Sequence, residues 1–327
     1  MGAIFSSDKG MAQSSEEQPS AQSSEESLNF YIFGNPVTMS PSPDMQNVGF
    51  AVNGFPHKYH RFDSPDVAEV IAKLRSADCG GGSVTIPHKE GVHAVMDELS
   101  EAARITGAVN TVTKVDGRFK GDNTDWIGIK KQLESRLPSP LPSPLCCLLC
   151  GAGGTAKAAA YALKQMGAHR VLIYNRTLSR AEDLAAEFGF EACGDLNAGL
   201  EGLEELHVVV NTLPGNTGFC LPEGAASQIL ARSRPAVLEA AYIPRRTAFV
   251  KQALAAGCEV VEGIEMLFEQ GCAQCEIWTG RPAPRAKIAS ALLKALFTEG
   301  SEHPAHPKME PYDELPKSLV REAASGE

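Results

Sequence analysis

The feature that most constrains this chain is the stretch of residues 145–163, which reads LCCLLCGAGGTAKAAAYAL. Its first six residues are apolar and have the length of a buried strand, and the alanine-rich run at its end favours a helix. Between them Gly151 and Gly153 stand two positions apart, with Ala156 three further on, as in the spacing G-x-G-x-x-G/A. The stretch therefore predicts a strand, a tight turn and a helix whose N-terminus binds a dinucleotide pyrophosphate. On this motif alone, a tight turn that binds nothing remains an alternative.

The end of the next expected strand, residues 170–174, bears on which dinucleotide binds. An acidic residue there binds the ribose hydroxyls of NAD, whereas an arginine nearby accommodates the 2′-phosphate of NADP. Here the strand is followed by Asn175, Arg176 and Thr177, without a carboxylate. The planar guanidinium of Arg176 can contact a phosphate, so NADP(H) is favoured, although an exposed loop arginine is the alternative. The candidate cofactor contacts are Gly151, Ala152, Gly153, Gly154, Thr155, Ala156, Asn175, Arg176, Thr177, Arg180, Asn211 and Thr212.

Length and composition place the chain among globular proteins. It has 327 residues, of which 43% are hydrophobic and 21% charged, enough for two domains of ordinary size. The net charge is −10, and residues 1–27 and 301–327 carry much of it, so we expect two disordered acidic tails and no nucleic-acid surface. No secretory signal is visible. We expect the cysteines in the expected strand 145–150 to be reduced and buried in the core. These features predict a cytoplasmic protein.

The N-terminus matches the N-myristoylation pattern, with Gly2 as acceptor and Ser6 at the required position. So short a pattern often matches by chance, and no basic cluster follows to supply a second anchor. We therefore expect a plain tail and no membrane association.

The order of expected elements predicts an α/β fold with two domains. Residues 28–130 would form an N-terminal α/β substrate domain, in which residues 35–47 are a proline-containing loop that carries Ser40 and Ser42. Residues 131–263 alternate strands and helices in the rhythm of a parallel, doubly wound Rossmann-type sheet. Helices within 264–300 follow the nucleotide domain and are expected to pack back on the first domain, which leaves a cleft between the two.

Two cysteine pairs with C-x-x-C spacing, Cys147/Cys150 and Cys272/Cys275, raise the possibility of zinc. The first pair falls in an expected buried strand and the second on an expected helix, with no further ligand set between them. We therefore expect no metal site.

Several short motifs stand before and after the glycine turn. Before it come GNPVTMSPSP at 34–43, SVTIPHKE at 83–90, GAVNT at 107–111 and GDNTD at 121–125. After it come EAAYIP at 239–244, GIEMLFEQG at 263–271 and WTGRPAP at 278–284. In this order they resemble shikimate dehydrogenase, with the closest similarity to the shikimate dehydrogenase domain of fungal-type pentafunctional AROM proteins. The resemblance extends over residues 29–298 and adds Gly263 to the expected cofactor contacts.

Lys89 and Asp125 are the candidate catalytic residues. Reversible hydride transfer between an alcohol carbon and a nicotinamide needs a group that exchanges the hydroxyl proton, and a partly desolvated lysine can do this. Asp125 can accept a hydrogen bond from the reacting hydroxyl and hold the ammonium by its charge. Considered separately, Lys89 would be interpreted as an exposed surface lysine and Asp125 as a helix-capping aspartate. The resemblance implies instead that the two form a catalytic pair.

The resemblance also implies a substrate site. A carboxylate on a polyhydroxylated ring requires hydroxyl donors or a cation, and Ser40 and Ser42 would fill this role. The residues expected to contact the ring hydroxyls are Thr85, Asn110, Asp125, Tyr242 and Gln270. The chain departs from the family where Met39 precedes Ser40 and where Gln46 stands before Asn47, since the family usually has histidine at both positions.

The predicted activity is therefore NADP-dependent shikimate dehydrogenase, an oxidoreductase that reduces 3-dehydroshikimate to shikimate in chorismate biosynthesis, beside other enzymes of the shikimate pathway. One alternative is an NAD-dependent quinate dehydrogenase, but its relatives tend to carry threonine at the position of Ser42. A second alternative is a non-catalytic regulator of the quinate pathway. Such a descendant should have lost Lys89 or Asp125, and both are present.

Overall fold

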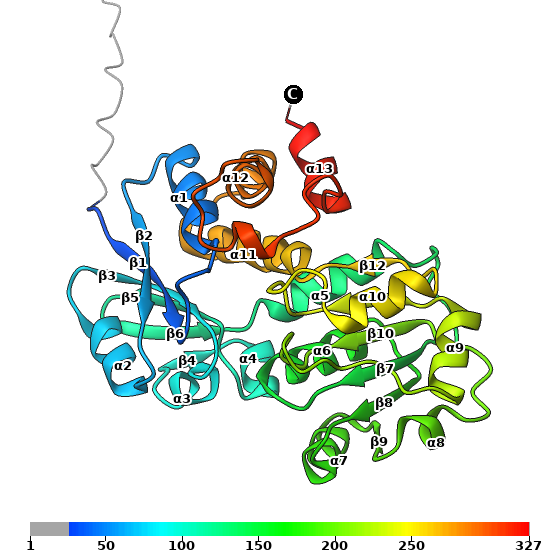
Figure 1. Cartoon of the computed structure of the whole chain (residues 1–327). Helices are drawn as coiled ribbons and strands as arrows, with labels where there is room; N and C mark the ends of the chain where they lie inside the picture. The colour runs from blue at the N-terminus through cyan, green and yellow to red at the C-terminus, as the bar shows by residue number, and fades with distance from the viewer. Residues whose placement is uncertain (1–25, 327) are drawn as a thin grey trace, which may run out of the picture.

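The computed structural model of the chain describes residues 26–326, so the predictions for residues 1–25, including Gly2, lie outside the described residues. Two six-stranded sheets, each covered by helices, stand side by side and are joined by α5 (Asp125–Glu134) (Figure 1). The predicted α/β fold class, with a Rossmann-type domain beside a second α/β domain, is confirmed. None of the helices within residues 26–326 is long and apolar enough to cross a membrane.

The N-terminal sheet is mixed and has the strand order β2-β1-β3-β5-β6-β4. Its strands are β1 (Asn29–Gly34), β2 (Lys58–Asp63), β3 (Cys79–Val84), β4 (Glu98–Leu99), β5 (Thr111–Val115) and β6 (Arg118–Asp122). β1 is parallel to both of its neighbours, while β5 is antiparallel to β3 and β6. Asp116 and Gly117, both with positive φ, form the tight turn between β5 and β6.

The second sheet is fully parallel, with the order β12-β11-β10-β7-β8-β9. Its strands are β7 (Cys146–Cys150), β8 (Arg170–Tyr174), β9 (Glu191–Cys193), β10 (Val208–Asn211), β11 (Ala236–Glu239) and β12 (Val260–Val261). Numbered within the domain this is 3-2-1-4-5-6, the Rossmann order, in which ligands bind where the order reverses at the carboxyl ends of the strands. The reversal lies between β7 and β10.

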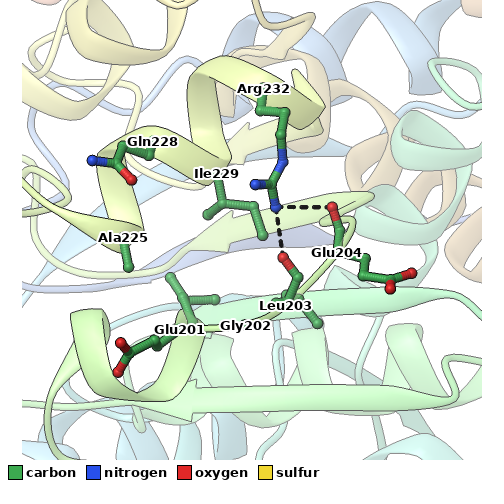
Figure 2. A pocket seen from close by; sticks show the side chains of 9 residues that line it. Glu201, Gly202, Leu203, Glu204, Ala225, Gln228, Ile229 and Arg232 are labelled. Atoms are coloured by element: carbon green, nitrogen blue, oxygen red, sulfur yellow. Dashed lines mark hydrogen bonds between the residues drawn. The ribbon is translucent and has the colours of Figure 1, made fainter.

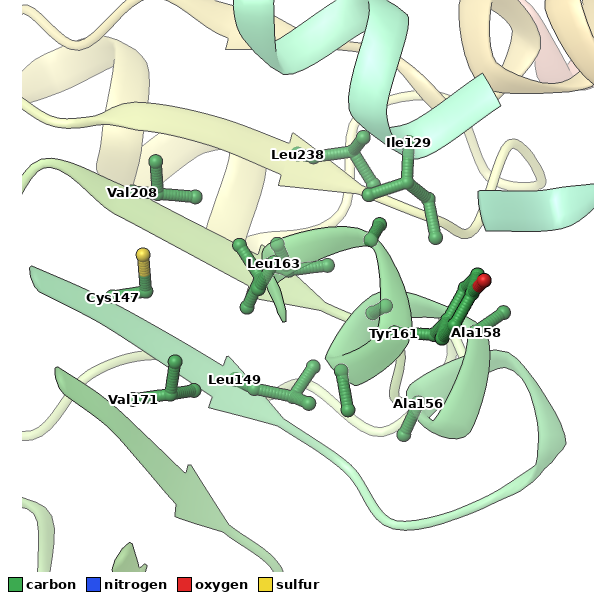
Figure 3. Packing of buried hydrophobic residues seen from close by; sticks show 14 of the residues in the cluster. Ile129, Cys147, Leu149, Ala156, Ala158, Tyr161, Leu163, Val171, Val208 and Leu238 are labelled. Atoms are coloured by element: carbon green, nitrogen blue, oxygen red, sulfur yellow. The ribbon is translucent and has the colours of Figure 1, made fainter. Parts of the chain in front are cut away.

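Helices cover both sheets. They are α1 (Ser42–Val52), α2 (Val67–Arg75), α3 (Lys89–His93), α4 (Glu101–Thr106), α5, α6 (Gly154–Gln165), α7 (Leu178–Phe188), α8 (Leu196–Leu200), α9 (Ala225–Ser233), α10 (Ala248–Ala255), α11 (Gly263–Thr279), α12 (Arg285–Phe297) and α13 (Lys317–Ala324). The alanine face of α6 lies on β7, where Leu149 and Leu163 form part of one buried cluster (Figure 3). Ile129 of α5 joins this cluster, so α5 packs against the Rossmann domain.

α11 and α12 pack back on the N-terminal domain. Met45 of α1 lies in the same buried cluster as Ile264 of α11 and Leu292 of α12. Gln46, also on α1, donates to the carbonyl of Gly271 on α11 at 2.9 Å. The last helices of the chain thus complete the domain that its first residues begin.

Two expectations about local structure are wrong. Residues 35–47 are not a loop throughout, because α1 begins at Ser42; Pro43 lies in its first turn, where the missing N–H of proline has no helical partner to lose. Residues 301–326 are not disordered either: they contain a 3₁₀ turn (His306–Lys308) and α13, and they bury Met309 and Leu319 in the cluster of α11 and α12. Their polar composition concealed a few buried apolar side chains and the ion pairs that residues 301–326 form with the rest of the described chain.

Candidate active site

The glycine turn has the geometry that its spacing predicts. Gly151 has φ +114°, and a Cβ on it would lie 2.2 Å from Oγ1 of Thr212, so this position requires glycine. Gly153 has an ordinary φ of −101°, and no atom lies within 4 Å of the place where its Cβ would stand. The first turn of α6 has no side-chain cap, so no side chain at the N-cap satisfies its first backbone N–H groups. This is a cradle that fits a pyrophosphate.

The segment after β8 presents cations and no carboxylate. Arg176 and Arg180 are exposed, and no residue within 26–326 forms an ion pair with either guanidinium or accepts a hydrogen bond from it. Asn175 donates to the carbonyl of Thr177 at 2.9 Å, which shapes the loop between β8 and α7. The arrangement leaves two positive side chains available at the place where an adenosine ribose lies in a Rossmann fold.

A cavity of about 460 Å³ lies between the two domains. The predicted site residues that line it are Ser40, Ser42, Thr85, Lys89, Asn110, Asp125, Thr155, Thr212, Tyr242, Gly263 and Gln270. The predicted residues that do not line it are Gly151, Ala152, Gly153, Gly154, Ala156, Asn175, Arg176, Thr177, Arg180 and Asn211. These lie in the glycine turn, the first turn of α6, the segment from the end of β8 into α7, and the end of β10. The fold thus brings all the predicted substrate residues together and places the cofactor residues along the adjoining edge of the parallel sheet.

Lys89 and Asp125 meet in this cavity. Lys89 begins α3 just after β3, and Asp125 begins α5 just after β6. Nζ of Lys89 donates to Oδ2 of Asp125 at 2.5 Å, and their side chains are 11% and 8% exposed. Nδ2 of Asn110 donates to Oδ1 of Asp125 at 2.8 Å. The two carboxylate oxygens of Asp125 therefore accept hydrogen bonds from Lys89 and Asn110, and the carboxylate does not cap α5.

Hydrogen bonds to the amide oxygen of Asn110 hold this side chain in place. Its Oδ1 accepts from the backbone N–H of Thr124 at 2.7 Å and from the hydroxyl of Thr111 at 2.7 Å. Its Nδ2 also lies 3.3 Å from Oε1 of Gln270 on α11. A single buried amide thereby links the carboxylate of Asp125 to α11, which lines the cavity.

Three hydroxyls, those of Ser40, Ser42 and Tyr242, line the same cavity. Oγ of Ser40 donates to Oγ of Ser42 at 3.1 Å, and both serines are buried. Burial raises the pKa of Tyr242, an effect that its hydrogen bond with Ser40 opposes, so the phenol remains a neutral donor at physiological pH. Neutral donors of this kind can hold a carboxylate without a cation.

Asn211 is held by a buried acid. Oε2 of Glu239 accepts from Asn211 at 2.8 Å and from the hydroxyl of Thr247 at 2.9 Å, and Oε1 accepts from the N–H of Ala241 at 3.1 Å. Burial nevertheless raises the pKa of Glu239 above its ordinary value, because these neutral donors only partly offset desolvation. Sequence reasoning did not single out Glu239, although it ends the strand adjacent to that of Asn211.

Gln274 is a second residue that sequence reasoning missed. It lines the cavity, accepts from Ser83 at 2.8 Å and donates to Thr111 at 3.0 Å. Because it stands four positions after Gln270, the helical period places both on one face of α11, and this spacing could have revealed it.

Another cavity, of about 570 Å³, lies between α8 and α9 in the Rossmann domain (Figure 2). Arg232 crosses it and donates to the carbonyls of Leu203 and Glu204. None of the predicted site residues lines it. Within residues 26–326 no three His, Cys, Asp or Glu side chains converge as they would around a metal ion, and all nine cysteines are free thiols.

Taken together, a Rossmann-type domain and a cavity with a Lys–Asp pair define a two-domain dinucleotide-dependent oxidoreductase. Family models for the shikimate dehydrogenase substrate binding domain, shikimate/quinate 5-dehydrogenase and the shikimate 5′-dehydrogenase C-terminal domain match residues 32–112, 144–239 and 263–293. The chain belongs to the shikimate dehydrogenase family, whose members are oxidoreductases that act on a CH–OH group.

Individual relatives agree with this assignment. Shikimate 5-dehydrogenase from Thermus thermophilus, solved with NADP(H) and shikimate, is 34% identical with a TM-score of 0.69, over 82% of this chain and all of that one. Quinate dehydrogenase from Corynebacterium glutamicum, solved with NAD, is 26% identical with a TM-score of 0.71, over 82% and 99%. The pentafunctional AROM polypeptide of Lachancea thermotolerans is 37% identical over 81% of this chain, which spans 18% of the length of that polypeptide.

Proposed function

We propose that this chain catalyses the reversible, NADP(H)-dependent interconversion of 3-dehydroshikimate and shikimate. The observation that carries the proposal is the 2.5 Å contact between Lys89 and Asp125 in a cavity that also holds the hydroxyls of Ser40 and Ser42. An acid–base pair and a carboxylate-binding wall in one cavity suit a ring that bears both a carboxylate and a carbonyl.

In reduction, the bound nicotinamide supplies the hydride to the carbonyl carbon. Lys89 donates a proton from its ammonium to the carbonyl oxygen, which becomes the product hydroxyl, and solvent then reprotonates the neutral amine. Asp125 accepts a hydrogen bond from that hydroxyl and keeps Lys89 in place, while Asn110 fixes the carboxylate. In oxidation the same groups act in reverse, and Lys89 takes up the hydroxyl proton.

The preference for NADP(H) rests on the segment after β8. Arg176 is an exposed, unpaired cation among residues 26–326, and it lies near the end of β8, where NAD enzymes carry an acid and this chain has none. The open space beside Gly153 and the uncapped N-terminus of α6 fit the pyrophosphate of either cofactor. Arg176 is thus the residue that would discriminate the 2′-phosphate. Since the AROM relatives are pentafunctional, we further propose that this chain supplies one step beside other enzymes of the shikimate pathway.

The test is an absorbance assay of reduced nicotinamide with the purified chain, run with NADPH or NADH and with 3-dehydroshikimate or 3-dehydroquinate. We expect the fastest turnover with NADPH and 3-dehydroshikimate. Faster turnover with NADH and 3-dehydroquinate would instead identify a quinate dehydrogenase. No turnover with any pair, despite tight binding of the acids, would identify a regulator.

A further inference from the structure

The C-terminal segment, defined as residues 301–326, folds back across the helical side of the molecule (Figure 1). It follows residues 263–293, which the C-terminal family model matches, so its contacts are an addition to the matched core. Ala305, Met309 and Leu319 are completely buried in the cluster that contains Met45 of α1. The segment is therefore a packed part of the fold that reaches both domains.

The middle of the C-terminal segment is tied to Arg245, which lies three positions after Tyr242. Arg245 is 2% exposed and binds both oxygens of Glu262, through Nε at 2.5 Å and Nη2 at 2.9 Å. The same guanidinium donates to three carbonyls of the C-terminal segment, those of Met309, Pro311 and Glu314. Glu262 immediately precedes Gly263, so the Arg245–Glu262 pair joins residues 240–243 to Gly263, and both line the cavity.

The beginning of the C-terminal segment reaches the turn before α1 that carries Ser40. Nδ1 of His303 accepts from the N–H of Ala305 at 3.1 Å, so the neutral ring carries its proton on Nε2. Nε2 therefore donates to Oδ2 of Asp44 at 3.4 Å, and the same carboxylate oxygen lies 3.8 Å from Nη2 of Arg61. Arg61 in turn donates twice to the carbonyl of Ser40, through Nε at 2.9 Å and Nη2 at 2.6 Å.

We propose that His303 is a positioning residue for the substrate carboxylate. It donates to Asp44, Asp44 pairs with Arg61, and Arg61 holds the carbonyl of Ser40, so that the hydroxyls of Ser40 and Ser42 face the cavity in one arrangement. This assignment rests on the proposed function, because it presumes that these hydroxyls bind the carboxylate of shikimate. Since His303 lies outside the cavity, it acts only through Asp44 and Arg61.

The test compares His303→Ala and His303→Gln in the full chain. The alanine variant should raise KM for shikimate about fivefold, the loss expected for one hydrogen bond, with kcat and KM for NADP unchanged. The glutamine amide can donate from nearly the position of Nε2, so His303→Gln should restore KM. His306→Ala is the matched control: its ring faces the carbonyl of Leu296 at 2.8 Å in the same segment, and KM should not change.

A second measurement is independent of activity. Hydrogen exchange at the amides of Ser40 and Ser42 should be faster in His303→Ala than in wild type and unchanged in His306→Ala. If the wild type has no activity with shikimate but this exchange pattern appears, the proposed function fails and the loop-positioning role of His303 stands. Equal effects of the two alanine variants, or unchanged exchange in His303→Ala, would overturn the proposal.

Discussion

The ammonium nitrogen of Lys89 lies 2.5 Å from Oδ2 of Asp125, although the two residues are 36 positions apart in the sequence. A nearly buried ion pair recovers the cost of desolvation only when further hydrogen bonds satisfy its remaining atoms. Asn110 supplies such a bond to Oδ1 of Asp125. This environment keeps the pair in one geometry at the wall of the cavity, where a reacting hydroxyl would lie.

Lys89 can be tested with two variants that separate chemistry from stability. Lys89→Ala should lower kcat at least a few hundredfold, because the acid–base group is lost, and should also destabilise the fold by leaving Asp125 unpaired. Lys89→Arg keeps the positive charge beside Asp125, but a guanidinium does not release its proton, so kcat should fall as far while the melting temperature stays near wild type. Steady-state kinetics and thermal unfolding measure both. Near-normal turnover in Lys89→Arg would exclude Lys89 as the proton donor.

Local patterns in the sequence are sufficient to predict the fold of the nucleotide domain. The spacing of Gly151, Gly153 and Ala156 is set by one turn, so it can be read without knowing the rest of the fold. Pairing Lys89 with Asp125 could not be derived in this way, because no periodicity links residues on different elements. Resemblance to a family supplied that pairing, and the structure brings the two side chains together.

The C-terminal segment shows where sequence reasoning fails. Its polar composition predicts disorder, yet Met309 and Leu319 are buried, and Arg245 binds the backbone of the segment from 64 or more positions away. Such contacts exist only after folding, so composition cannot register them. Helix α1 was missed for a related reason, because prolines at positions 41 and 43 signal a loop although both are compatible with a helix start.

The two glycines of the turn should respond differently to alanine. Gly151→Ala should destabilise the protein by at least about 2 kcal/mol, since alanine is strained at φ +114° and its Cβ would overlap Thr212. Gly153→Ala has room and an ordinary φ, so its melting temperature should match wild type, while KM for NADPH should rise about tenfold as the methyl group obstructs the pyrophosphate. Urea unfolding and kinetics measure these effects. Wild-type stability in Gly151→Ala would contradict the described turn.

Arg176 should determine cofactor preference. Arg176→Ala should raise KM for NADPH about tenfold or more, the usual loss for a hydrogen bond to a charged group, and should leave KM for NADH unchanged. Arg118→Ala is a suitable control, because Arg118 is also an exposed arginine, paired at 3.6 Å with Glu98 in the other domain. Parallel losses with both cofactors in Arg176→Ala would show that the residue does not recognise the 2′-phosphate.

Glu239 should make stability depend on pH in the direction opposite to that of a salt-bridged acid. Burial raises its pKa above the ordinary value of 4.5, so just above pH 4.5 the native state binds more protons than the unfolded state. Its contribution to the free energy of unfolding is therefore complete below pH 4.5 and is lost as the pH rises through the folded-state pKa. Glu239→Gln cannot ionise, so its stability relative to wild type should rise as the pH increases from below 4.5 toward neutral. Urea unfolding of both proteins at several pH values measures the difference, and a difference that is constant with pH would show that Glu239 has no raised pKa in the folded protein.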